Sequence, residues 1–161
     1  MPKEPLAYFI TFRTYGSWLH GDDRGSIDRE HNIPGTPLVS AHAGRATYEG
    51  SMMQQETVRL NEHCRTVVRT TVREVADRRS WTVHALEVRS NHVHLVISAP
   101  LAPERVMNDL KSWATRRLID AGLLKKDMKA WSRHGSTRYL WKERDVEDAC
   151  RYVCERQGED I

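Results

Sequence analysis

The chain has 161 residues, 39% of them hydrophobic, and a formal net charge of +3. This length suits one compact domain, and no run of about 20 apolar residues could span a membrane. The N-terminus "MPKEPLAYFITF" lacks the basic region, apolar run and cleavage site of a signal peptide, so we expect a cytoplasmic protein with no membrane partner. The three cysteines form no CxxC pair and are expected to be reduced thiols.

The N-terminal third is predicted to contain one strand, a long loop and one helix. Residues 6–14, "LAYFITFRT", are rich in aromatic and β-branched residues and predict a strand. Residues 15–50 are rich in Gly, Pro, Asp and Asn, and predict a loop inserted into a single domain, 1–161. Apolar residues then recur every three or four positions, which predicts an amphipathic helix over 53–78.

The middle of the chain is predicted to form a hairpin and a second helix. Two β-rich runs, 81–89 and 92–99, are joined by Ser90-Asn91, which favours a tight turn. The helix is predicted over 103–121, with Gly122 as its stop.

The C-terminal part is predicted to add a strand and a last helix. Residues 130–142 carry aromatic residues around a Gly-Ser turn and predict a strand or a hairpin. A helix capped by Asp145 and ended by Gly158 follows. This order of elements favours an α+β fold, a ferredoxin-like antiparallel sheet with helices on one face plus a C-terminal helix.

Two histidines lie one residue apart in the predicted strand "HVHLVISA". Because strand side chains alternate, His92 and His94 share one face while Val93, Leu95 and Ile97 claim the core. Their Cα atoms are expected about 7 Å apart, so both imidazoles can converge on one ion. The pair leaves positions for a third ligand, water and a phosphate oxygen. A pair of hydrogen-bonded histidines without a metal is the alternative.

The segment "NHVHLVIS" resembles the histidine-hydrophobic-histidine signature of the HUH single-strand endonucleases. "DVEDACRYVCERQG" resembles the tyrosine-bearing helix of the single-tyrosine transposases in that group, including the REP-associated tyrosine transposases. "LKSWATRRL" and "YLW" lie between them in the order of that family, so the resemblance covers about 6–157. It implies that His92 and His94 hold Mg²⁺ or Mn²⁺. It also implies that Tyr152 forms a 5′-phosphotyrosine link to single-stranded DNA.

The helical pattern supports a site position for Tyr152. At about 100° per residue, Tyr152 falls at the edge of the apolar stripe of the last helix, from where it can reach a site on the sheet. The family usually supplies a third metal ligand one turn later, but Arg156 occupies that position and cannot coordinate a cation. Glu155 and Gln157 are the two candidates for this ligand, and the choice between them stays open.

Positive charge is concentrated near the C-terminus. Between Lys111 and Arg144, ten Lys or Arg residues stand against three acidic ones, a local excess of +7. Such asymmetry favours a surface for single-stranded or hairpin DNA, although a solvated basic surface would give the same count. The residues expected to contact DNA are Lys111, Arg116, Arg117, Arg133, Arg138 and Lys142.

Three functions are compatible with this sequence. The first is a metal-dependent transposase that cleaves and rejoins single-stranded DNA. The second is a catalytically weak or inactive domesticated relative that binds hairpin DNA, and the third is a phosphoesterase that activates water at the histidine pair. The loop 15–50 is expected to recognise a hairpin or to cover the cleft. A monomer and a homodimer both stay open.

Overall fold

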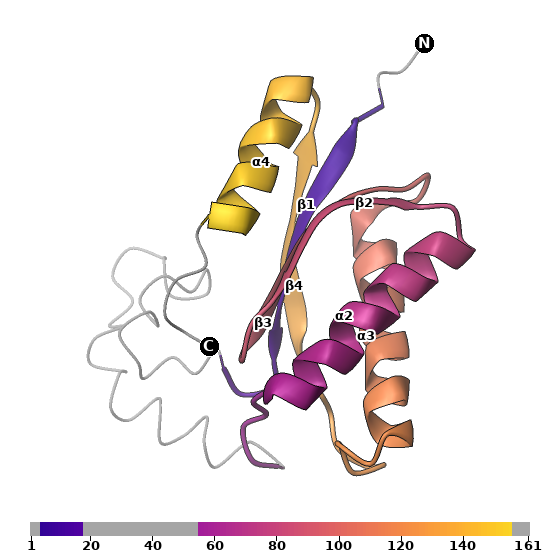
Figure 1. Cartoon of the computed structure of the whole chain (residues 1–161), viewed down its shortest axis with the longest axis vertical. Helices are drawn as coiled ribbons and strands as arrows, with labels where there is room; N and C mark the ends of the chain where they lie inside the picture. Colours follow the sequence, from indigo (N-terminus) through magenta and orange to yellow (C-terminus); the bar gives the residue numbers. More distant parts are fainter. Residues whose placement is uncertain (1–3, 18–54, 156–161) are drawn as a thin grey trace, which may run out of the picture.

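A four-stranded antiparallel sheet forms the centre of the protein in the computed structural model, which describes residues 4–17 and 55–155 (Figure 1). The strand order is β2-β3-β1-β4, with β1 and β3 in the middle. This order and the alternation of strands and helices confirm the predicted ferredoxin-like α+β fold. The strands are β1 (Ala7–Thr14), β2 (Thr82–Val88), β3 (His92–Ser98) and β4 (Trp131–Leu140).

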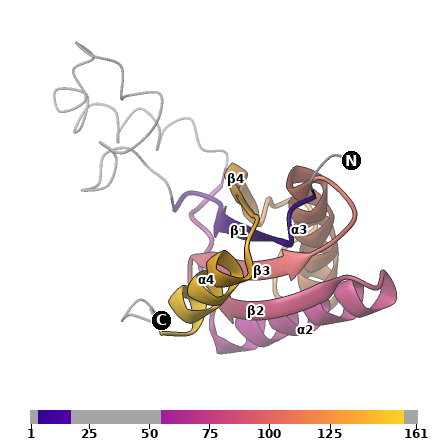
Figure 2. The same ribbon diagram turned by 90° about the horizontal axis from the view of Figure 1, so that it is seen from above.

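Helices cover both faces of the sheet. α2 (Glu62–Arg78) and α3 (Pro103–Asp120) pack on one face, and α4 (Glu143–Glu155) lies on the other (Figures 1 and 2). The alternation of β1 explains this arrangement. Ile10 and Phe12 are buried beneath α2 and α3, whereas Phe9 is buried with Ala149 and Val153 of α4. The C-terminal helix is therefore anchored on the face that carries the two histidines.

The first helix begins later than its apolar pattern predicts. The sequence predicts a helix from residue 53, but α2 begins at Glu62, and the side chain of Asn61 caps it by accepting a hydrogen bond from the Cys64 amide at 2.8 Å. Leu60, which belongs to the same apolar stripe, is buried in the core from an irregular segment and donates its amide to Ser90 O at 2.7 Å. The apolar spacing therefore continues before the start of α2 because Leu60 is buried, although Leu60 is not helical.

The predicted cap of the last helix is also displaced. α4 begins at Glu143, so Asp145 lies in its first turn and is not the cap. A carboxylate there is favourable because it faces the positive end of the helix dipole. The predicted end at Gly158 and the predicted loop beyond Ser17 lie outside the described residues. None of the described helices is both long enough and apolar enough to cross a membrane.

β4 runs as one strand through the Gly-Ser pair, so the hairpin alternative for 130–142 is wrong. Gly135 allows β4 to pack closely, because an added Cβ would lie 2.5 Å from both Met107 Sδ and the Thr11 carbonyl oxygen. The carbonyl belongs to a strand paired with β4 and cannot move without disturbing the sheet.

Gly135→Ala is expected to lower the free energy of unfolding by about 1–3 kcal/mol, because it overpacks this contact. Urea unfolding measures the loss. Ser136→Ala is the matched control at the next, exposed position, and should change stability by less than about 0.5 kcal/mol. Equal stability of the two variants would contradict the steric argument.

Candidate active site

The two histidines of β3 lie side by side on the face covered by α4. The ring centroids of His92 and His94 are 4.5 Å apart, and the planes are inclined by 70°. Val93, which lies between the two histidines, and Leu95, which follows His94, are buried on the opposite face, as the alternation predicts. His92 is buried and His94 is half-buried.

Each imidazole is oriented by a neighbouring polar side chain. Nδ1 of His92 lies 2.7 Å from Asn91 Oδ1, and Nδ1 of His94 lies 2.9 Å from Thr11 Oγ1. Thr11 is the partner of His94 in the β1–β3 pairing, so the sheet register itself sets this contact. A ring held through Nδ1 presents Nε2 as its metal-binding nitrogen. The pair therefore fits two ligands of a divalent ion.

Tyr152 lies beside this pair. Its ring centroid is 5.9 Å from that of His94 and 5.7 Å from that of Phe9, and the side chain is 43% exposed. The packing of α4 sets the position of Tyr152. Ala149 and Val153 are buried against the sheet, and Tyr152 lies at the edge of that contact. The histidines and the tyrosine come from the same chain, about sixty residues apart in sequence but adjacent in space.

A cleft of about 480 Å³ opens between α4 and the sheet at this point. The sheet contributes Arg138 of β4 and His94 of β3 to its lining. Helix α4 contributes Asp145, Asp148 and Tyr152. The volume is that of an ordinary small-ligand site and can hold a nucleotide-sized group. The cleft thus combines one cationic side chain, two carboxylates, a phenol and an oriented imidazole.

Among the described residues, no third metal ligand is gathered with the histidines. Across residues 4–17 and 55–155, no group of three or more His, Cys, Asp or Glu side chains is placed to hold an ion. Glu155 is exposed and lines a smaller hollow together with Asp148, Arg151 and Tyr152. Gln157 lies outside the described residues. Of the predicted metal ligands that the structure describes, only His92 and His94 are brought together.

Lys111 has a structural role in the protein, and its contact with DNA stays a prediction. It is 8% exposed, and its ammonium group donates to the carbonyls of Ser132 at 3.1 Å and His134 at 3.4 Å. The amine also lies 5.9 Å from the centre of the Phe12 ring. The side chain therefore ties α3 to β4, and its aliphatic stem fills an apolar position of the helix.

Burial lowers the pKa of Lys111 below its ordinary value of 10.5. Between the lowered pKa and 10.5, the unfolded chain binds more protons at this residue than the folded chain, so stability rises with pH over that interval. We expect the free energy of unfolding of the wild type, minus that of Lys111→Met, to increase as the pH approaches 10.5. Urea unfolding of both proteins over an alkaline pH series measures it. A difference independent of pH would contradict this assignment.

The other basic residues fall into separate groups. Arg138 lines the cleft, whereas Arg133 and Lys142 are exposed and do not line it. Arg116 and Arg117 belong to α3 and lie across the sheet from Tyr152. The predicted basic set is therefore not one continuous surface at the site.

Several residues in the cleft or paired with its histidine strand were not singled out from the sequence. Thr11, Ser136 and Asp148 line the cleft, and Arg13 lies directly across from His92 in the β1–β3 pairing. The alternation of "LAYFITFRT" contained a signal for two of them, because Thr11 and Arg13 occupy the face opposite the buried Ile10 and Phe12. No local pattern identifies Ser136 or Asp148.

Fold and site together define a ferredoxin-like domain in which a histidine pair on a central strand faces a tyrosine on a helix packed across the sheet. The profile of the family described as "Transposase IS200 like" matches residues 52–155, most of the chain and all of this site except its β1 residues. The protein belongs to this family of transposases.

Two solved structures are similar at low identity. A REP-associated tyrosine transposase bound to a REP hairpin is 13% identical with a TM-score of 0.49, and the match covers 93% of this chain and 65% of that one. A transposase candidate from Deinococcus radiodurans R1 is 17% identical with a TM-score of 0.45, covering 98% of this chain and 95% of that one. No curated protein matches the chain significantly.

Proposed function

We propose that this transposase cleaves and rejoins single-stranded DNA through a 5′-phosphotyrosine intermediate on Tyr152. The observation that carries the proposal is the meeting of Tyr152 and His94 in one cleft, at 5.9 Å between ring centroids, with Arg138 on its wall. His92 and His94 would hold a divalent ion, Mg²⁺ or Mn²⁺, through Nε2. When bound, such an ion polarises the scissile phosphate and offsets the charge that develops on it.

The reaction at Tyr152 is a transfer between two esters. The phenolic oxygen attacks phosphorus, so that an O–P bond forms to Tyr152 and the bond from phosphorus to the 3′ oxygen breaks. The phenol loses its proton, and the leaving oxygen gains one to become a 3′-hydroxyl. Arg138 lines the cleft and would bind a phosphate oxygen of the strand. Because an ester replaces an ester, the link can be passed to another 3′-hydroxyl, which rejoins DNA.

A second candidate function is binding of hairpin DNA by a catalytically weak relative. The observation that favours it is that, over the described residues, no third His, Cys, Asp or Glu joins the histidine pair. In either case the DNA-contacting residues would include Arg138. In a homodimer each subunit would carry its own histidine pair and its own tyrosine.

One experiment separates these functions. The protein is incubated with Mn²⁺ and with 3′-end-labelled single strands that carry a hairpin, and the products are run on a denaturing protein gel. A labelled band at the mass of protein plus DNA, absent with EDTA, supports the transposase. Cleavage without an adduct would instead indicate hydrolysis by water, and a shifted band on a native gel without cleavage would indicate the second candidate.

A further inference from the structure

Strand β2 places a carboxylate beside the histidine pair. Glu87 lies directly across from His94 in the β2–β3 pairing, and Thr11 lies across from His94 on the β1 side. Paired residues of antiparallel strands project to the same face, with their Cβ atoms about 4.5–5.5 Å apart. Glu87, His94 and Thr11 therefore form a row across the sheet, on the face that carries the histidines.

The contact between His94 and Thr11 turns the metal-binding nitrogen of His94 toward β2. Nδ1 of His94 lies 2.9 Å from Thr11 Oγ1, on the β1 side of the ring. In an imidazole, Nδ1 is attached on one side of Cγ and Nε2 lies on the other side, and only the nitrogen without such a contact is available to an ion. The side of the ring that carries Nε2 is therefore the side on which Glu87 stands.

Two arginines lie next to the other histidine. Arg13 is directly across from His92 on β1, and the Arg89 amide of the β2 side donates to the His92 carbonyl at 2.8 Å. The Arg89 side chain is almost completely buried. Guanidinium groups close to neutral imidazoles disfavour a divalent cation, because like charges repel strongly where water is excluded. A histidine pair in this setting needs a negative group nearby to retain such an ion.

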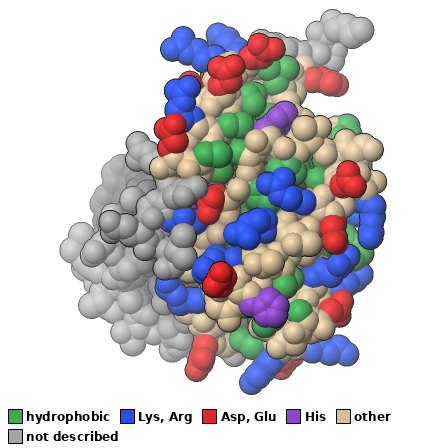
Figure 3. Space-filling view, in the orientation of Figure 1, with side chains coloured by type: hydrophobic (Ala, Val, Ile, Leu, Met, Phe, Trp, Pro, Cys, Tyr) green, Lys and Arg blue, Asp and Glu red, His purple; other side chains and the backbone are tan. Residues whose placement is uncertain are grey.

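Glu87 is the only carboxylate that the four strands provide. The segments β1, β2, β3 and β4, all of them described by the structure, contain no other Asp or Glu. The outer surface differs, because acidic and basic side chains are interspersed over the face seen in Figure 3. The position of this carboxylate at the histidine pair is therefore not part of a general pattern of surface charge.

Arg89 holds Glu87 without occupying all of its oxygen lone pairs. Nη1 of Arg89 lies 3.5 Å from Glu87 Oε1, and the Glu87 side chain keeps 21% of its surface exposed. A charge-assisted hydrogen bond would be about 2.7–2.9 Å long, so this contact is a looser ion pair. An ionised carboxylate has about four acceptor positions. Glu87 can therefore accept a hydrogen bond from a water molecule while it stays near Arg89.

We infer that Glu87 is a positioning residue of the metal site, whose carboxylate accepts a hydrogen bond from a water ligand of the ion held by His92 and His94. This inference rests on the proposed function. Hard ions such as Mg²⁺ keep several water ligands, and outer-shell carboxylates orient the ligands of a metal. In the described part of the chain no third direct ligand joins the histidines, which agrees with a carboxylate that acts through water.

The test measures the Mn²⁺ affinity of Glu87→Gln by isothermal titration without DNA. The substitution keeps the size of the side chain and removes its charge. We expect the affinity to fall roughly tenfold to a hundredfold, as loss of an outer-shell partner does in other metal sites. Glu87→Asp keeps the charge, and should bind Mn²⁺ more tightly than Glu87→Gln.

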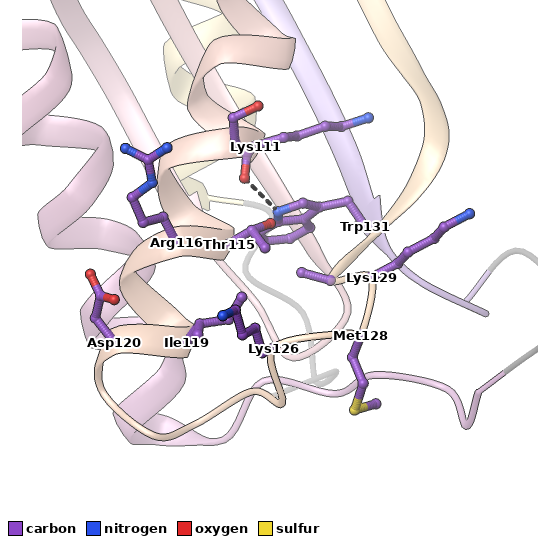
Figure 4. A pocket seen from close by; sticks show the side chains of 11 residues that line it. Lys111, Thr115, Arg116, Ile119, Asp120, Lys126, Met128, Lys129 and Trp131 are labelled. Atoms are coloured by element: carbon purple, nitrogen blue, oxygen red, sulfur yellow. Dashed lines mark hydrogen bonds between the residues drawn. The ribbon is translucent and has the colours of Figure 1, made fainter.

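Asp120→Asn is the matched control. Asp120 is an exposed carboxylate at the end of α3, in a hollow that Arg116, Lys126 and Lys129 also line, on the other side of the sheet (Figure 4). The control therefore removes a carboxylate from among cations, but at a place distant from the histidines. It should bind Mn²⁺ as the wild type does.

Wild-type affinity in Glu87→Gln, or an equal loss in Asp120→Asn, would overturn the inference. So would a Glu87→Gln protein that loses stability in urea without metal but keeps its Mn²⁺ affinity, because Glu87 would then serve Arg89 alone. If Glu87→Gln does not fold, Glu87→Thr gives the same comparison, since threonine suits a strand. A wild type that does not bind Mn²⁺ would refute the metal site and this inference together. Absence of the covalent adduct, with the expected affinities, would refute the transposase reaction alone.

Discussion

Tyr152→Phe is expected to abolish the covalent protein–DNA adduct and to reduce strand cleavage by roughly three orders of magnitude or more, as loss of a nucleophile does in other covalent enzymes. The change removes only the phenolic oxygen. Phenylalanine keeps the ring that contacts Phe9 and His94, and the position is 43% exposed, so the fold should be unaffected. The denaturing gel with labelled DNA measures the adduct.

The matched control is Tyr139→Phe. Tyr139 is 46% exposed, close to the exposure of Tyr152, but it stacks on Trp141 and does not line the cleft. This variant should form the adduct at the wild-type level. An adduct that persists in Tyr152→Phe would show that another side chain is the nucleophile, and would remove the central residue of the proposal.

Elements whose pattern is local were predicted correctly from the sequence. The alternation around His92 and His94 fixed their common face, because only one register buries Val93, Leu95 and Ile97 together. The apolar stripe of the last helix likewise placed Tyr152 at the edge of a buried face, and Ala149 and Val153 of that stripe are buried. Both predictions depend on a periodicity that tertiary contacts did not override.

The distribution of positive charge could not be predicted in the same way. Counting charges between Lys111 and Arg144 shows an excess but does not show which face each residue occupies. Lys111 fills a core position because its long stem reaches two carbonyls of β4, and Arg117 is paired with a residue of another helix. Both contacts join segments distant in sequence, so no local pattern could have revealed them.

The side of the sheet covered by α4 was also undetermined. An amphipathic helix can pack on either face of a sheet, and the predicted stripe specifies only that it packs. The deciding residues are on the strands, where Phe9, Ala85 and Val96 form a second apolar patch opposite the main core. Because α4 packs on this patch, Tyr152 lies on the face of the sheet that carries the histidines. The apolar residues of the strands therefore determine the position of Tyr152 together with the helix.

Replacing either histidine is expected to cause the second large effect. His92→Ala and His94→Ala should each weaken Mn²⁺ binding by more than the roughly 10–100-fold that follows loss of an outer-shell partner, because each removes a ligand itself. Isothermal titration with Mn²⁺ measures this affinity without any DNA or turnover. The adduct should disappear in parallel.

His63→Ala is the control, since His63 is an exposed residue of α2, on the other side of the sheet. It should bind Mn²⁺ and form the adduct as the wild type does. Wild-type affinity in both His92→Ala and His94→Ala would contradict the metal site even if cleavage failed. Both variants keep Tyr152 and Arg138, so absence of the adduct with retained DNA binding would assign the histidines to the chemical step and not to holding the strand.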